Sequence, residues 1–353
     1  MHILPSKSDR WFEMASLRYR GSVHLAPIIA ALIAASLPLS VHAQVPANTL
    51  SPAADSTTVQ AAPTVTNAPP QRHQPEDPLQ LRQVLLWENG APGALGDHQA
   101  DKPFLTIITP SAVQNNGPAV IVAPGGGYIG LELNHEGREI ADWFAAHGVT
   151  AFVLRYRLTP SGYHHPAQLQ DGTRAVRWVR SHAADFNIDP DRIGMIGFSA
   201  GGHLTTMVAT QANDGDAAAI DPVERASSRL NFMVLCYPGV LRSAEVVTTK
   251  RLLGDHPDPA TADQINTEKY ITKDTPPTFI FHTSDDKIVP VGRVLEFYEA
   301  LQKAGVPVEM HVFEHGYHGL GFALTNRSIR ALPSLLENWL ESHGMLWPGP
   351  KSR

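Results

Sequence analysis

The sequence predicts an α/β fold in which helices cover both faces of a mostly parallel β-sheet. Apolar runs of strand length alternate with helical segments from about residue 84 onward, and most of these strands are apolar throughout. Such strands are typical of a parallel sheet that is buried between helices. The expected strands lie near residues 104–109, 119–123, 150–155, 192–197, 231–237, 278–283 and 307–313. The expected helices lie near residues 136–147, 170–185, 200–210, 290–304 and 332–343.

Each element has its own local pattern. Residues 119–123 form an unbroken apolar run that stops at Pro124, which predicts a buried strand. The segment 170–185 carries its apolar residues on one side and is expected to be an amphipathic helix. Segment 239–275 interrupts the alternation and shows little periodicity, so we predict a small insertion there that lies over the functional site.

The first 43 residues have the features of a secretory signal peptide. Positive charge precedes an apolar stretch over residues 25–39, and Val41-His42-Ala43 is a small-x-Ala cleavage signal. No Arg-Arg pair precedes the stretch, so we expect the general secretory route, with cleavage near Ala43 and a periplasmic or secreted product. No stable membrane insertion is expected after processing. Two alternatives stay open: Met14 as the true start, and retention of the segment as an anchor.

Residues 44–80 are expected to form a linker. They are rich in Ala, Pro, Thr, Val and Gln, a composition that cannot bury a core. One folded domain is expected to follow over residues 81–347.

The most informative motif is Gly197-Phe198-Ser199-Ala200-Gly201, which lies between an apolar strand and an apolar helix. This G-x-S-x-G pattern is typical of a nucleophile elbow, where a serine at the tip of a strained turn needs small neighbours. The free N–H groups of the following helix would face an oxyanion formed beside Ser199. Taken alone, the pattern is also compatible with an ordinary turn.

A second motif, Gly125-Gly126-Gly127, follows the strand expected at 119–123. A phosphate-binding loop needs a different glycine spacing. An oxyanion loop needs backbone N–H groups without side chains in the way, which three glycines supply. We therefore favour an oxyanion loop over a plain turn.

Two further segments complete the chain order Ser, Asp, His. Asp285 and Asp286 follow the strand expected at 278–283, and His315 and His318 follow the last expected strand. A carboxylate at a strand end can orient an imidazole, and a histidine on a Gly-rich loop can reach the serine. The residues alone leave the choice within each pair open, and each could instead be a cap, turn or solvated residue.

Together with their flanking segments, these motifs carry a resemblance to a known family. They are, in chain order, Leu86-Trp87-Glu88-Asn89-Gly90-Ala91-Pro92-Gly93, Pro124-Gly125-Gly126-Gly127-Tyr128, His135-Glu136-Gly137, Arg155-Tyr156-Arg157-Leu158, Asp189-Pro190-Asp191-Arg192-Ile193-Gly194, Gly197-Phe198-Ser199-Ala200-Gly201-Gly202-His203-Leu204, Asp285-Asp286-Lys287-Ile288-Val289-Pro290 and His318-Gly319-Leu320-Gly321. Over roughly residues 84–345 the chain resembles the α/β-hydrolase superfamily, and more narrowly its acetyl xylan esterase and feruloyl-esterase-like (BD-FAE-like) group. The resemblance implies an α/β-hydrolase catalytic domain over 81–347 with a central sheet of about seven or eight strands.

The resemblance also implies roles for single residues. Ser199 matches the nucleophile, His318 the general base and Asp286 the carboxylate that orients the histidine. Asp286 matches better than Asp285 because a Val-Pro pair follows it at the family's spacing. His318 matches better than His315 because a Gly-Leu-Gly segment follows it.

The family's oxyanion donors fall on the backbone N–H groups of Gly126, Gly127 and Ala200. Tyr128, beside this loop, is predicted to contact the substrate. Where the family often has Asn after the Val-Pro segment, this chain has Gly292-Arg293, which leaves the substrate contacts near that helix open.

Composition argues against other classes of protein. The 353-residue chain is 43% hydrophobic, has a formal net charge of −6 and contains no basic block, so nucleic acid is not an expected partner. Its single cysteine, Cys236, is expected to be a buried strand residue and permits no internal disulfide. His135, His164 and His165 lack metal-ligand spacing, so neither a metal nor another cofactor is expected.

The predicted function is a secreted serine carboxylic-ester hydrolase that works through an acyl-enzyme. The expected ligand is a small ester or an acetylated saccharide, with xylan or its oligosaccharides favoured by resemblance and secretion. A serine peptidase of the same fold and a non-catalytic ligand-binding relative remain alternatives, although relatives of the second kind usually lack one triad residue. The sequence leaves the acyl group, the alcohol and the oligomeric state open.

Overall fold

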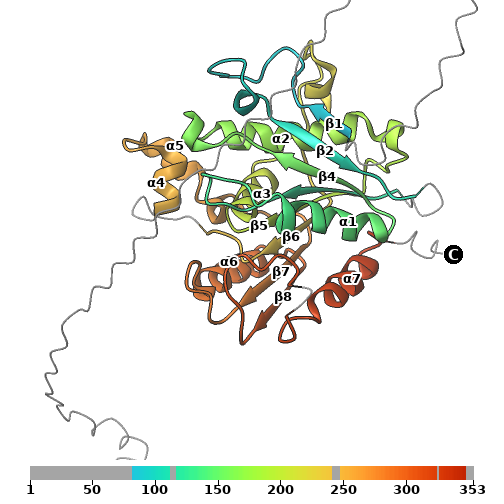
Figure 1. Ribbon diagram of the computed structural model, residues 1–353, viewed down its shortest axis with the longest axis vertical. Helices are drawn as coiled ribbons and strands as arrows, with labels where there is room; N and C mark the ends of the chain where they lie inside the picture. The colour runs from blue at the N-terminus through green and yellow to red at the C-terminus, as the bar shows by residue number, and fades with distance from the viewer. Residues whose placement is uncertain (1–81, 112–116, 241–246, 324–325, 347–353) are drawn as a thin grey trace, which may run out of the picture. The chain divides into compact units, whose positions relative to one another are not determined.

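An eight-stranded, mostly parallel β-sheet forms the centre of the described chain (Figure 1). The computed structural model describes residues 82–111, 117–240, 247–323 and 326–346. The strands are β1 (Arg82–Leu85), β2 (Phe104–Ile108), β3 (Ala119–Ala123), β4 (Thr150–Arg155), β5 (Ile193–Phe198), β6 (Phe232–Cys236), β7 (Thr278–Thr283) and β8 (Val308–Phe313). Their order is β1-β2-β4-β3-β5-β6-β7-β8. Only the pairs β1–β2 and β2–β4 are antiparallel among these, which confirms the predicted fold class.

Helices cover both faces of the sheet. They are α1 (Glu139–Ala146), α2 (Ala167–Ser181), α3 (Ala200–Thr210), α4 (Val247–Leu253), α5 (Pro259–Gln264), α6 (Val291–Lys303) and α7 (Leu332–Ser342). Short 3₁₀ turns lie at Gln99–Asp101, Thr159–Ser161, Ala183–Phe186, Pro222–Arg225 and Thr267–Tyr270, and one π-helical turn at Asn134–Arg138. The apolar residues of α2, α3 and α6 join one core cluster, and those of α1 and α7 join a second.

The two clusters explain why the central strands are largely apolar on both faces. In β3 all five residues are buried. Ile121 packs in the first cluster, whereas Val120 and Val122 pack in the second. Successive side chains of a strand point to opposite faces, so both faces of this strand must be apolar.

The structure differs from the sequence expectation in two elements. The edge strand β1 was not expected, because its four residues are mostly exposed and carry no apolar run. Segment 239–275, which shows little periodicity in the sequence and was predicted to be a small insertion, contains the helices α4 and α5 in its described residues, 239–240 and 247–275. These helices have seven and six residues, which is too short for a helical pattern to stand out in the sequence.

The predicted signal peptide (1–43) and linker (44–80) lie outside the described residues. All described residues fall within one compact unit, Gln71–Arg353. None of the described helices is both long and apolar enough to cross a membrane.

Parallel pairing places the functional motifs together. The strands β3, β5, β7 and β8 run in the same direction, so their carboxyl ends meet at one edge of the sheet. The Gly-rich loop follows β3, Ser199 follows β5, and the loops with Asp286 and His318 follow β7 and β8. Ligands of open α/β sheets bind at this edge.

Candidate active site

Ser199 lies at the tip of a tight turn between β5 and α3. Its φ of 51° and ψ of −117° are a conformation that L-residues rarely adopt. Glycine makes the turn possible, because a Cβ on Gly201 would lie 2.1 Å from the carbonyl oxygen of Ala123. A Cβ on Gly197 would lie 2.3 Å from the carbonyl oxygen of Gly201. The G-x-S-x-G pattern therefore has a steric cause in this fold, and it leaves Ser199 in the wall of a cavity.

A chain of hydrogen bonds links Ser199, His318 and Asp286. The Ser199 Oγ and His318 Nε2 atoms are 2.7 Å apart, and His318 Nδ1 is 2.7 Å from Asp286 Oδ2. The other Asp286 oxygen accepts the backbone N–H groups of Ile288 and Val289, at 2.8 and 2.9 Å. The carboxylate is thus fixed on both oxygens and holds the imidazole with Nε2 toward the serine.

The electrostatics favour an ionised Asp286. Burial of the side chain, which is 1% exposed, works against the charged form. The hydrogen bonds from His318 and from the two backbone N–H groups outweigh burial, so the pKa of the Asp286 carboxyl lies below its usual value. A negative carboxylate beside His318 stabilises the imidazolium that forms when the histidine takes a proton.

The competing residues Asp285 and His315 do not join this chain. Asp285 Oδ1 accepts the N–H of Gly316 at 2.7 Å, and its other oxygen lies 3.5 Å from His315 Nδ1. The two side chains are 43% and 66% exposed, and neither lines the cavity. They connect the loop after β7 to the loop after β8, whereas Asp286 orients His318 toward Ser199.

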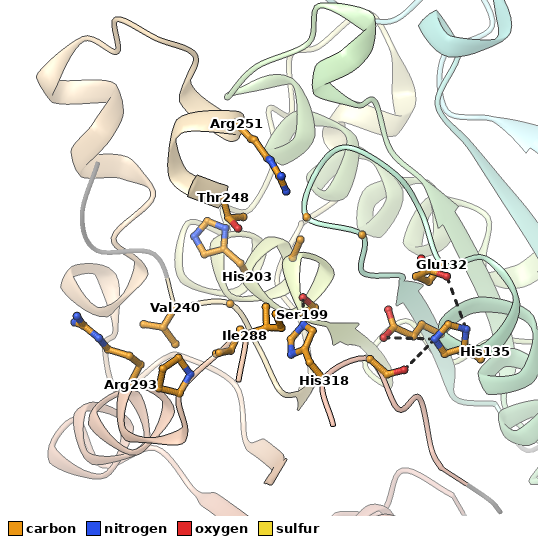
Figure 2. Close-up of a pocket in the computed structure, with 18 residues that line it drawn as sticks. Glu132, His135, Ser199, His203, Val240, Thr248, Arg251, Ile288, Arg293 and His318 are labelled. Atoms are coloured by element: carbon orange, nitrogen blue, oxygen red, sulfur yellow. Dashed lines mark hydrogen bonds and ion pairs between the residues drawn. The ribbon is translucent and has the colours of Figure 1, made fainter. Parts of the chain in front are cut away.

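The cavity has a volume of about 710 Å³ and opens over Ser199 (Figure 2). Its walls come from the loop after β3, the start of α3, helix α4 and the loops after β6, β7 and β8. The lining residues are Gly126, Gly127, Glu132, His135, Glu136, Ser199, Ala200, His203, Gly239, Val240, Thr248, Arg251, Ile288, Val289, Pro290, Arg293, His318 and Gly319. Thr248 and Arg251 of α4 bring the insertion into this wall.

The three expected oxyanion donors all line this cavity. Ala200 is the first residue of α3, where a helix leaves its N–H groups unpaired. Gly126 has a φ of 129°, and its carbonyl oxygen accepts the N–H groups of Ile129 and Gly130, which folds the loop back on itself. Within the described ranges, no acceptor meets the N–H of Gly126, Gly127 or Ala200. These groups can bind an oxyanion that forms beside Ser199.

The prediction for Tyr128 is wrong. Its side chain is fully buried and is absent from the cavity wall. Its hydroxyl lies 2.8 Å from His203 Nδ1, and its ring packs edge-on against Tyr156. The residue follows the Gly-rich loop with a φ of 63°, and this turn directs the ring into the core instead of toward the substrate.

His203 connects three parts of the site, and the sequence did not single it out. Its Nδ1 contacts the Tyr128 hydroxyl, and its Nε2 lies 2.9 Å from the carbonyl oxygen of Ile265 in the insertion. Burial lowers the pKa of His203 to about 4, so the ring is neutral at neutral pH. The Ile265 carbonyl can only accept, so Nε2 carries the proton and Tyr128 donates to Nδ1. The ring therefore ties α3 to the Gly-rich loop and to the insertion.

Glu136 and Tyr237 form a second network that the sequence did not reveal. Glu136 Oε2 accepts the N–H of Gly125 at 2.8 Å, and Oε1 accepts the hydroxyl of Tyr237 at 2.7 Å. The same hydroxyl accepts the N–H of Gly321, beyond His318, at 2.7 Å. Burial raises the pKa of the Glu136 carboxyl. The pair joins the oxyanion loop to the histidine loop, and the only sequence signal was the His135-Glu136-Gly137 motif.

Replacing Tyr237 by phenylalanine should loosen both loops. It leaves Glu136 Oε1 and the buried N–H of Gly321 without this partner, which costs about 1–3 kcal/mol. We expect the free energy of unfolding in urea to fall by that amount, and kcat for an acetyl ester to fall with it. Tyr317→Phe is the matched control, since that ring is 70% exposed beside His318, and it should change stability by less than about 0.5 kcal/mol. A Tyr237→Phe protein as stable and active as the parent would contradict the network.

The remaining candidates have structural partners. His164 Nδ1 lies 3.0 Å from the Arg251 carbonyl, and His165 Nε2 lies 3.0 Å from Gln264 Oε1. Among the described residues, no three His, Cys, Asp or Glu side chains are grouped to hold a metal ion. Cys236 is buried in β6, and burial raises the pKa of its thiol well above the usual value.

Comparison with known proteins shows which family the chain resembles. Residues 105–301 match the family model described as BD-FAE. The chain is 34% identical over 244 residues to an acetylxylan esterase of Xylanibacter ruminicola, covering 67% of this chain and 47% of the relative. It is 35% identical over 208 residues to endo-1,4-beta-xylanase B of Butyrivibrio fibrisolvens, covering 58% of this chain and 32% of the relative. The chain thus spans about half and about a third of these two relatives.

A protein of solved structure is similar over a larger share of both chains. It is an acetyl ester-xyloside bifunctional hydrolase from Caldicellulosiruptor lactoaceticus, with a TM-score of 0.69 and 42% identity, covering 75% of this chain and 97% of that one. Fold and relatives together define the described domain as a carboxylic-ester hydrolase of the α/β-hydrolase fold. Within that class, the chain belongs to the BD-FAE family.

Proposed function

We propose that the protein removes acetyl groups from xylan or acetylated xylo-oligosaccharides, with Ser199 as the nucleophile. The observation that carries the proposal is the hydrogen-bonded chain from Asp286 through His318 to Ser199, at the wall of a cavity with three backbone N–H groups that meet no acceptor in the described part of the chain. Support for the substrate comes from the similarity to the Xylanibacter acetylxylan esterase and the Caldicellulosiruptor acetyl ester-xyloside hydrolase.

The proposed reaction has two halves. His318 Nε2 takes the Ser199 proton as Oγ bonds to the ester carbonyl carbon, and the N–H groups of Gly126, Gly127 and Ala200 stabilise the oxyanion. His318 then gives the proton to the leaving alcohol oxygen, which leaves an acetyl-enzyme on Ser199. Water, deprotonated by His318, attacks this ester and releases acetate, and the proton returns to Ser199. Asp286 keeps its charge throughout and stabilises the imidazolium.

A panel of 4-nitrophenyl esters tests the preference for acetate. The wall above Ser199 carries Thr248 and Arg251, so a long acyl chain would bury its methylenes against polar groups. We expect kcat/KM to fall at least about tenfold from acetate to octanoate, and acetate to be released from acetylated xylan. Faster hydrolysis of octanoate, or no acetate from xylan, would count against an acetyl esterase.

We further propose that residues 1–43 are a signal peptide that directs export of the protein to the periplasm or the medium, where the enzyme would encounter fragments of the polymer. The support is the charged, then apolar, then small-residue pattern of that segment. The proposal requires a mature chain that begins near Gln44, and N-terminal sequencing of fractionated cells decides whether it does.

A further inference from the structure

Arg251 is a charged residue of the cavity that the proposed ester chemistry does not use. Figure 2 shows its side chain extending from α4 toward the space over Ser199. Its Nη1 lies 3.1 Å from the position that a Cβ on Gly127 would occupy, so the guanidinium reaches the oxyanion loop. The Arg251 side chain is solvent-exposed, and its cation lies beside the oxyanion loop.

The backbone that carries Arg251 is held firmly. The carbonyl oxygen of Arg251 lies 3.0 Å from the His164 ring, and that of Leu252 accepts the N–H of His165 at 2.8 Å. The Leu252 side chain is fully buried in the core. These contacts fix the backbone from which the Arg251 side chain extends.

The charge of Arg251 is not neutralised within the described residues. No carboxylate among them lies within ion-pair distance of its guanidinium. Of the two carboxylates in the cavity wall, Glu136 is held by Gly125 and Tyr237, and Glu132 lies near His135. In Figure 2, Glu132 and His135 lie to the right of Ser199, whereas Arg251 lies above it. A carboxylate of a ligand would meet an unpaired cation there.

The wall contains a second arginine, Arg293 of α6, in a different position. Figure 2 shows it beyond Val240, with its guanidinium directed away from Ser199. Arg251 is thus the cation that a group bonded close to the scissile ester can reach. A guanidinium is suited to such a role, because its planar set of donors binds a carboxylate through two parallel hydrogen bonds.

We infer that Arg251 forms an anion subsite, and that the enzyme prefers esters that carry a carboxylate near the scissile bond. The carboxylate can belong to the alcohol part, as in an acetylated xylo-oligosaccharide with a uronic acid substituent, or to the acyl part, as in a dicarboxylic half-ester. The inference rests on the ester hydrolysis proposed above and adds that the preferred ester substrate carries a negative charge.

Matched substrate pairs test the subsite. The alcohol pair is acetylated xylo-oligosaccharide with and without a glucuronic acid substituent, and the acyl pair is phenyl hydrogen glutarate and phenyl methyl glutarate. We expect kcat/KM to be higher for the charged member of one pair than for its neutral member. Arg251→Gln should reduce this charged-to-neutral ratio of kcat/KM by about fivefold. Arg251→Lys should keep part of the preference, and added salt should weaken it. The pair that responds shows which part of the substrate holds the carboxylate.

Lys250→Gln is the matched control. It removes the same charge from the same helix at a residue outside the cavity wall, and it should leave the ratio unchanged. An Arg251→Gln enzyme with unchanged ratios in both pairs overturns the subsite, as does a Lys250→Gln enzyme that loses as much preference. Absence of activity on all four substrates would instead refute the proposed ester hydrolysis, so the two failures are distinguishable.

Discussion

Replacing Ser199 by alanine is expected to lower kcat for acetyl esters by about 10⁴- to 10⁶-fold. The substitution removes only the hydroxyl that lies 2.7 Å from His318 Nε2. The residual rate would come from the oxyanion donors and from substrate binding. Initial rates on 4-nitrophenyl acetate, with urea unfolding as the measure of an intact fold, check this result.

A fluorophosphonate probe supplies the control for this variant. The parent protein should be labelled, because the probe reacts with an activated serine, whereas Ser199→Ala should stay unlabelled. Substantial turnover by the alanine protein, once contaminating parent enzyme is excluded, would remove Ser199 from the mechanism. A parent protein that neither reacts nor turns over would favour a non-catalytic ligand-binding relative.

The second large effect separates the paired candidates. His318→Ala should lower kcat by several orders of magnitude, comparable to the serine variant, because no other base contacts Ser199 among the described residues. His315→Ala should leave kcat within about threefold, since that ring is 66% exposed and outside the cavity wall.

The same comparison applies to the carboxylates. Asp286→Asn should lower kcat by about 10³- to 10⁴-fold. Its oxygen would stay with the N–H groups of Ile288 and Val289, so its NH₂ would face His318 Nδ1. The imidazole would then carry its proton on Nε2 and could not accept the serine proton. Asp285→Asn is the control and should cost little. A larger loss at Asp285 or His315, in folded proteins, would transfer the roles to those residues.

The sequence predicted the parts of the fold that have a regular pattern. The strands β3, β5 and β7 are apolar on both faces because two core clusters enclose them, and such runs are visible without a structure. The triad candidates were found for a related reason, since parallel strands bring their carboxyl ends, and the loops after them, to one edge. The choice of Asp286 and His318 over their neighbours came from family spacing and not from the residues alone.

What the sequence missed depends on long-range contacts. Glu136 and Tyr237 are 101 residues apart and meet only because the π-helical turn Asn134–Arg138 and the end of β6 lie at the same edge. Tyr128 was assigned to the substrate because it adjoins the glycines, but a positive φ directs its ring into the core. Helix α4 has seven residues, of which Leu252 and Leu253 join the core, and this is too few to show a helical pattern in the sequence. The cation of Arg251 in the cavity could therefore be found only from the structure.

The proposed reaction passes through an acyl-enzyme on Ser199, and rapid-quench mass spectrometry tests for this intermediate most directly. The protein is mixed with excess 4-nitrophenyl acetate, quenched in acid during the first turnovers, digested and analysed peptide by peptide. We expect one acetyl group on the peptide that contains Ser199, bound to that side chain and absent from the Ser199→Ala protein. Steady turnover with the acetyl group on a different residue, or with no acetylated peptide in any quench, would contradict it.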